Sequence, residues 1–168
     1  MIQIRLTRQL HDVVRTDLRR PHPFAAERVG FLFGQLDKSA GGPLVLLTAY
    51  EPVADERYVR DRHVGARIDG QAIRCVMQRV ISRRECAFHT HWHEWPGTPR
   101  FSPTDHDELP RVVQGFRNAG PALAHGMFLF SNDECAAWVW TAGTTAPAVA
   151  GKISVVGFPF QSFEGGET

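Results

Sequence analysis

Two long apolar segments separated by a short polar turn constrain the fold of this chain most. Residues 24–36 end in a run of aromatic and branched side chains that favours a strand, and residues 43–50 are predicted as its antiparallel partner. Residues 37–43 between them are polar and rich in glycine, which is typical of a turn. Because a strand as apolar as residues 43–50 is usually buried on both faces, we expect this hairpin to belong to the core.

Two further segments carry apolar residues at helical spacing. The first follows Thr7, which is suited to cap a helix, and ends before Pro21. The second follows Asp69 and runs into the arginines at 83–84, whose positive charge suits a helix C-terminus. The apolar positions are Leu10, Val13, Val14 and Leu18 in the first segment and Ile73, Val76, Met77, Val80 and Ile81 in the second.

The remaining elements are shorter. Residues 2–6, 64–68 and 153–156 are predicted as strands, and residues 122–130 and 134–141 as a hairpin.

A third helix is expected to begin at Ser102 and Pro103 and to end at Gly120, with Pro110 kinking or restarting it. The chain of 168 residues, 43% of them apolar, suits one compact domain. We therefore predict an α/β (α+β) domain over residues 1–160, with a mixed, mostly antiparallel sheet flanked by helices. A flexible tail is predicted over residues 161–168.

Charge and cysteine content narrow the classes of function. A formal charge of +1 provides no bulk attraction to nucleic acid or to an anionic membrane. Three scattered cysteines form no disulfide framework, and no apolar run approaches the length of a membrane span or of a signal peptide. These features predict a cytoplasmic (cytosolic) protein without nucleic-acid or membrane partners.

Residues 85–91 are predicted as a strand that carries two histidines. His89 and His91 are separated by one residue, so both project from the same face of a strand. With Asp105 from the next helix they form a three-ligand set that suits catalytic zinc and leaves one position for water. His93 has the same parity and is an extra ligand if the strand continues, whereas the proline-rich loop after it argues against this.

Each of the other site candidates also has a structural explanation. Glu27 is an acid at the entrance of an apolar strand, and periodicity alone favours a solvated position paired with Arg28 or another arginine. Ser102 and Asp105 have the spacing of a helix capping box, which explains both residues without a metal.

Taken together, these residues resemble the JAMM motif of the MPN/JAB metalloprotease family. The order of predicted elements is also similar, with a helix preceding the histidine strand. The segments that carry the resemblance are Glu27-Arg28-Val29-Gly30-Phe31-Leu32-Phe33-Gly34, His89-Thr90-His91 and Ser102-Pro103-Thr104-Asp105. The resemblance implies the MPN/JAB architecture, which is similar to that of cytidine deaminases.

The resemblance also implies a role for each residue. His89, His91 and Asp105 would bind Zn²⁺ together with a water molecule. Glu27 would take a proton from that water and pass it to the leaving amine, which leaves poorly unless it is protonated. Ser102 would stabilise the oxyanion of the tetrahedral intermediate.

The loop at residues 92–101 departs from the family pattern, in which proline follows the second histidine and the loop is shorter. Trp92, Trp95 and Phe101 either pack this loop onto the domain, which is the favoured interpretation, or line the path of an extended substrate.

The resemblance implies a JAMM-type zinc metallopeptidase similar to stand-alone bacterial deubiquitinases. Its reaction would be cleavage after the C-terminal glycine of a ubiquitin-like modifier, as a peptidase or isopeptidase. Its partners would be that C-terminal tail, its conjugates and the E1-like and E2-like proteins of the same pathway, with phage defence as one setting. The alternatives are a small-molecule amidohydrolase, a peptidase that processes sulfur-carrier proteins, and a non-catalytic MPN scaffold.

Overall fold

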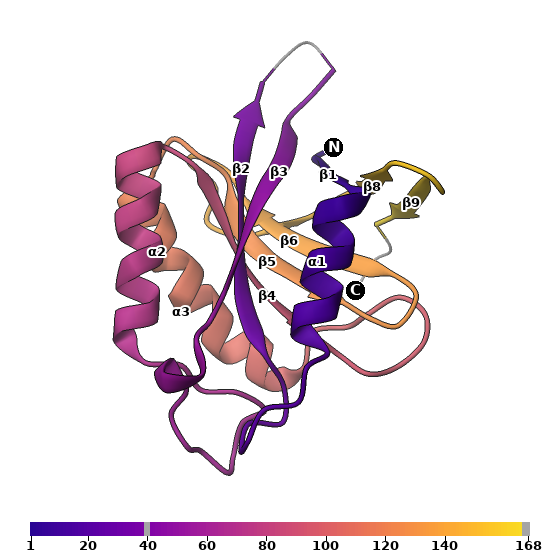
Figure 1. Ribbon diagram of the computed structural model, residues 1–168. Helices are drawn as coiled ribbons and strands as arrows, with labels where there is room; N and C mark the ends of the chain where they lie inside the picture. Colours follow the sequence, from indigo (N-terminus) through magenta and orange to yellow (C-terminus); the bar gives the residue numbers. More distant parts are fainter. Residues whose placement is uncertain (39–40, 166–168) are drawn as a thin grey trace.

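The computed structural model describes residues 1–38 and 41–165, which form a nine-stranded mixed sheet with three α-helices (Figure 1). The elements are β1 (Gln3–Thr7), α1 (Arg8–Leu18), β2 (Val29–Asp37), β3 (Leu44–Pro52), a short 3-10 helix η1 (Asp55–Arg57), α2 (Gly70–Arg83), β4 (Cys86–Trp92), α3 (Pro103–Ala119), β5 (His125–Phe130), β6 (Cys135–Trp140), β7 (Ala148–Val149), β8 (Lys152–Val156) and β9 (Gln161–Glu164). Their order across the sheet is β7-β6-β5-β4-β2-β3-β1-β8-β9.

The expected hairpin lies at the centre of this sheet. Strands β2 and β3 pair antiparallel, with a register shift between Phe33 and Gly34. Strand β2 pairs antiparallel with β4 on its other side, so that Val29 lies opposite His91 and Phe31 opposite His89. This register decides which side chains approach the two histidines.

The predicted fold class is wrong in its architecture. The sheet is mixed, and most of its strand pairs are antiparallel as expected. We expected it inside a helix-flanked MPN/JAB sandwich, but the sheet is the dominant element and curls into a half-barrel (Figure 1). Strand β1 pairs in parallel with the outer edge of β3, and β8 pairs in parallel with β1. Strand β9 then pairs antiparallel with β8. The register shift in β2 contributes to the curl, because such a bulge bends a strand and increases its twist.

Alternating side chains of the central strands pack into two separate clusters. On one face, Val14 and Leu18 of α1 pack with Phe88 of β4 and with strands β5 and β6. On the other face, α2 and α3 lie side by side and cover β2, where Phe116 contacts Phe31 edge to face with ring centroids 5.9 Å apart (Figure 1). The strand period of two thus separates the face of His89 and His91 from that of Phe88.

Several predicted elements differ from those observed. Residues 24–28 precede β2 rather than belonging to it, and residues 64–68 form no strand apart from a single bridge between Tyr58 and Ile68. Helix α3 runs through Pro110 without restarting. The predicted tail begins with strand β9, which pairs with β8, and residues 166–168 of that tail lie outside the described part, as do residues 39–40 of the predicted turn.

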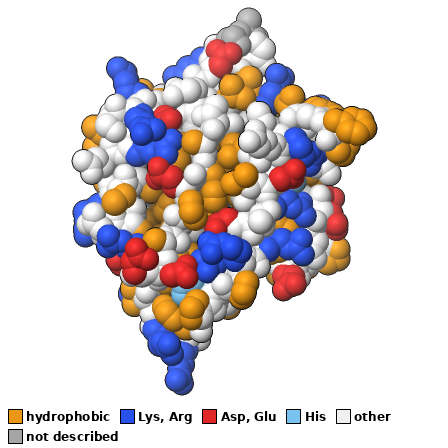
Figure 2. All heavy atoms as spheres, in the orientation of Figure 1, with side chains coloured by type: hydrophobic (Ala, Val, Ile, Leu, Met, Phe, Trp, Pro, Cys, Tyr) orange, Lys and Arg blue, Asp and Glu red, His pale blue; other side chains and the backbone are white. Residues whose placement is uncertain are grey.

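The surface mixes charges. Figure 2 shows that basic and acidic side chains are interspersed on the face viewed in Figure 1 rather than gathered into one patch. Over residues 1–38 and 41–165, no helix is both long enough and apolar enough to cross a bilayer.

The buried His125 makes folding sensitive to pH. Its Nδ1 accepts a hydrogen bond from the Ala87 N–H at 3.1 Å, and Nε2 lies 3.0 Å from the Gly120 carbonyl, so the ring is neutral in the folded protein. Burial lowers the pKa of His125 below its ordinary value of 6.5, despite these backbone bonds. The unfolded chain therefore binds more protons below that pH.

We expect the stability contributed by a neutral His125 to be complete above pH 6.5 and to decrease as the pH falls below it. Replacing His125→Asn is expected to flatten this dependence by up to about 1.4 kcal/mol per pH unit, the effect of one proton. Urea unfolding of both proteins between pH 7.5 and 5 in the presence of a chelator measures the difference. Equal slopes would contradict the assignment.

Candidate metal centre

Strand β4 and the residue that follows it present three histidines to one side of the sheet. His89 and His91 alternate with Phe88, Thr90 and Trp92, which point to the opposite face. The strand ends at Trp92, but the His93 N–H donates to the Phe130 carbonyl at 2.9 Å, so pairing with β5 continues. His93 therefore lies on the same side as the other two histidines.

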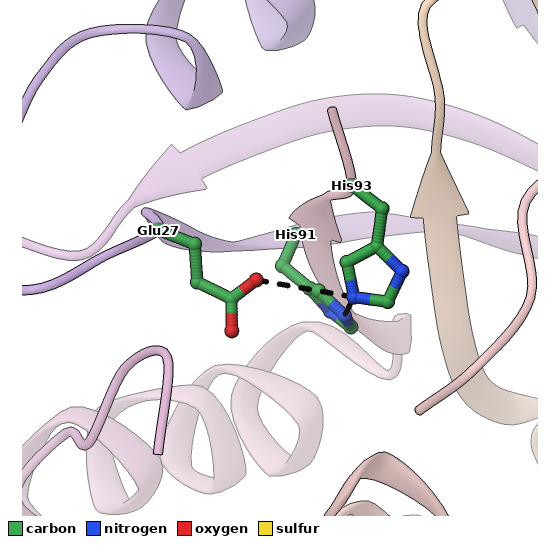
Figure 3. Close-up of side chains that lie close together, drawn as sticks. All are labelled: Glu27, His91 and His93. Carbon is green, nitrogen blue, oxygen red and sulfur yellow. Dashed lines mark hydrogen bonds and ion pairs between the residues drawn. The ribbon is translucent and has the colours of Figure 1, made fainter. Parts of the chain in front are cut away.

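The register between β2 and β4 brings Glu27 to these histidines. Val29 lies opposite His91, so two residues earlier Glu27 lies across from His93. Its Oε2 is 3.9 Å from Nε2 of His93, and Figure 3 shows the carboxylate directed toward the rings of His91 and His93. The side chain of Glu27 is 25% exposed, and the neighbouring Arg28 pairs with Asp55 instead.

The loop before α2 holds Glu27 in this position. The N–H groups of Ala26 and Glu27 both donate to the Gly65 carbonyl, at 2.8 and 3.3 Å. A Cβ atom on Gly65 would lie 2.2 Å from Oε1 of Glu27, so any larger residue at this position would displace the Glu27 carboxylate.

The N-terminus of α3 supplies a second carboxylate. Ser102 Oγ accepts from the Asp105 N–H at 3.2 Å, and Asp105 Oδ2 accepts from the Ser102 N–H at 2.7 Å, which completes the predicted capping box. The same Asp105 carboxylate places Oδ1 3.3 Å from His91 Nε2 and Oδ2 3.6 Å from His93 Nε2. The helix cap and the histidine contacts thus coexist in one residue.

These side chains share one cavity of about 560 Å³. Glu27, His89, His91, Ser102 and Asp105 all line it, although three different parts of the chain carry them. Residues 61–68 form a further stretch of its wall, and apolar side chains of β2 and α3 complete it.

A group of three residues at this cavity could hold a metal ion: Glu27 and His91 line the cavity, whereas His93 lies beside it. One ligand atom from each of Glu27, His91 and His93 lies within 4.8 Å of the others. The set differs from the predicted one, because Glu27 and His93 stand in place of His89 and Asp105. The ring centroid of His89 lies 5.6 Å from that of His91.

Burial and charge set the protonation of the centre. Burial lowers the pKa of His89 to about 3, so this imidazole is neutral at neutral pH. Burial opposes a charge on His91 as well, but its hydrogen bond with Asp105 and the nearby Glu27 raise its pKa. Burial also opposes ionisation of Asp105, yet the hydrogen bonds from His91 and Ser102 hold its pKa well below its usual range. Burial raises the pKa of Glu27.

The residues fit a bound divalent cation. Nε2 of His91 and Nε2 of His93 lie 3.2 Å apart, and oxygens of the Asp105 carboxylate lie 3.3 and 3.6 Å from them, so nitrogen and oxygen ligand atoms converge. Metal binding requires neutral imidazole and ionised carboxylate, and the lowered pKa values of His89 and Asp105 favour these forms. The raised pKa of His91 means that a cation would bind there in competition with a proton. A cation bound between Nε2 of His91 and Nε2 of His93 would also remove the repulsion between their lone pairs, which lie on atoms only 3.2 Å apart.

The aromatic residues of the loop do not line the cavity. Trp92 is buried on the opposite face, where it stacks on Phe130, and Phe101 is buried against Trp138. Trp95 is 42% exposed, with its ring centroid 4.5 Å from that of His93. The positions of Trp92 and Phe101 agree with the packing interpretation.

No protein-family model matches this chain, and no curated protein matches it.

Two parts of the centre, His93 and the loop around Gly65, were not predicted from the amino-acid sequence as parts of the site. The parity of His93 indicated its side of the strand, but the proline-rich loop argued against its participation. Gly65 and the wall at residues 61–68 carried no recognisable signal, because their proximity to Glu27 depends on contacts between distant segments.

Proposed function

We propose that this protein is a zinc-dependent peptidase or isopeptidase of the JAMM type, which cleaves after the C-terminal glycine of a ubiquitin-like modifier. The observation that carries the proposal is one cavity lined by residues from three separate segments of the chain. These residues are Glu27, His89, His91, Ser102 and Asp105. The resemblance of these residues to the JAMM motif supports the family and the substrate class.

Each residue has a chemical task in this proposal. His89, His91 and Asp105 hold the ion, which supplies a lowered pKa for the attacking water and polarisation of the scissile carbonyl. Glu27 takes the proton of that water and delivers it to the departing amine nitrogen. Its position within 3.9 Å of His93, on the cavity wall, supports this task.

Ser102 is assigned to the developing oxyanion. Its Oγ accepts a hydrogen bond from the Asp105 N–H, and a hydroxyl that accepts one bond still has its own hydrogen to donate. A donor aimed at an oxyanion contributes about 3 kcal/mol in comparable sites.

The volume and lining of the cavity suit a bound peptide segment. Its volume of about 560 Å³ falls within the usual range of ligand sites, roughly 300–1,000 Å³. Val29, Ile68, Leu109 and Val112 give the wall apolar surface beside the polar centre.

The proposal is tested with a ubiquitin-like protein fused at its C-terminal glycine to a reporter. We expect the zinc-loaded protein to release the reporter, and a chelator to abolish the release until zinc is restored. Activity that persists after complete chelation would contradict the proposal. Hydrolysis of a free amino-acid amide, without cleavage of the fusion, would favour the small-molecule amidohydrolase instead.

A further inference from the structure

His93 occupies the middle of the metal centre. Its Nε2 lies 3.2 Å from His91 Nε2, 3.6 Å from Asp105 Oδ2 and 3.9 Å from Glu27 Oε2. A water molecule that attacks with help from Glu27 must also lie between this acid and the groups that hold the ion. Figure 3 shows the ring of His93 facing Glu27 across this space.

The other ring nitrogen determines the tautomer of His93. Its Nδ1 lies 3.0 Å from the Arg100 carbonyl, which can only accept a hydrogen bond, so Nδ1 carries the hydrogen. The neutral ring therefore directs the lone pair of Nε2 at His91 and Asp105. A backbone carbonyl that orients an imidazole in this way is a common partner of metal-binding histidines.

The spacing of the three groups fits one ion. Bonds of about 2.0–2.1 Å in a tetrahedron place neighbouring ligand atoms about 3.3 Å apart. His91 Nε2 and His93 Nε2 are 3.2 Å apart, and oxygens of the Asp105 carboxylate lie 3.3 and 3.6 Å from them.

From this geometry we infer that His93 is a displaceable metal ligand, which closes the coordination position that the attacking water needs. The inference rests on the proposed function, because it concerns the same ion. With His89, His91 and Asp105, a bound His93 completes four protein ligands, and such a closed set is typical of structural rather than catalytic zinc. The resting protein is then latent, and activity requires the segment that carries His93 to move.

Side-chain and backbone hydrogen bonds hold this segment in the resting position. Asn132 N–H donates to the Trp95 carbonyl at 3.0 Å, and Ser131 Oγ donates to the Gly97 carbonyl at 2.6 Å. Thr98 Oγ1 donates to Glu134 at 2.6 Å. The turn between β5 and β6 is therefore the part of the protein whose movement would release His93.

The experiment compares zinc-loaded wild-type protein with His93→Ala and His93→Gln. X-ray absorption at the zinc edge counts the imidazole ligands, and we expect three in the wild type and two in both variants. The rate of zinc extraction by a chelator is expected to rise about ten-fold or more, because loss of even an outer-shell partner costs about 10–100-fold in affinity.

Cleavage of the modifier fusion is the second measurement. In the wild type the open conformation, in which His93 has left the ion, is a minor state, and such states are populated at about 0.1–10%. Removal of His93 makes this open state the dominant one, so kcat/KM is expected to rise about ten-fold or more. Glu94→Ala, a substitution at an exposed neighbour in the same loop, serves as the matched control and is expected to retain the wild-type imidazole count and rate.

An unchanged imidazole count in both His93 variants would overturn the inference, and so would a rate that falls when the imidazole is lost. Wild-type protein that binds no zinc would overturn the proposed function as well, which the metal content shows before any variant is made.

Discussion

Replacing Glu27→Gln is expected to lower kcat for cleavage of the modifier fusion by about 10²–10⁴-fold while zinc remains bound. Glutamine has nearly the shape of glutamate, so the close packing against Gly65 is retained. It cannot accept and return a proton, so the amine nitrogen is not protonated and its departure is slow. Single-turnover cleavage by zinc-loaded protein measures the loss.

The change at Glu27 separates the chemical step from metal binding. The proposal assigns the ion to His89, His91 and Asp105, which are intact in Glu27→Gln, so the zinc content is expected to equal that of the wild type. Loss of zinc would instead identify Glu27 as a ligand, together with His91 and His93. Glu94→Gln makes the same chemical change at an exposed position and should leave kcat unchanged. A Glu27→Gln protein with zinc bound and wild-type kcat would refute the role of Glu27.

Replacing Asp105→Asn is expected to abolish stable zinc binding, and with it the activity. The amide is uncharged and a much poorer ligand, so the affinity should fall by more than the roughly 10–100-fold expected for an outer-shell residue. The amide oxygen can still accept from the Ser102 N–H, which preserves part of the capping box. Calorimetric titration with Zn²⁺ measures the affinity.

Asp105→Ala provides the comparison that separates the cap from the metal site. Alanine removes the acceptor for the Ser102 N–H, although the Ser102 hydroxyl can still cap the helix. Loss of one such hydrogen bond costs about 1 kcal/mol in the free energy of unfolding. In metal-free protein we therefore expect Asp105→Ala, but not Asp105→Asn, to unfold at lower urea concentration. Full zinc affinity in Asp105→Asn would show that the carboxylate only caps the helix.

The local elements were largely predictable because their signals lie within a few residues. Thr7, Asp69 and Ser102 cap the three helices as expected, since the side-chain acceptor and the N–H that it binds are three residues apart. The capping box of Ser102 and Asp105 was equally visible. Pro110 does not restart the helix, because the packing of α3 against the sheet and α2 outweighs one lost backbone hydrogen bond.

The architecture was not predictable from the same signals. Burial on both faces was inferred for residues 43–50, yet β3 alternates between buried and more exposed positions. The parallel pairing of β1 with β8 joins segments more than a hundred residues apart. No local pattern records such pairing, so the curled sheet was mistaken for a helix-flanked sandwich.

The amino-acid sequence by itself determined the helix caps, the apolar stripes and the side of β4 on which His89 and His91 lie, because these depend on spacing along one element. Only the tertiary structure decided that Glu27 lies within 3.9 Å of His93 and that Asp105 lies beside His91. Those distances follow from the register of β2 on β4 and from the packing of α3, which are set by contacts over the whole domain.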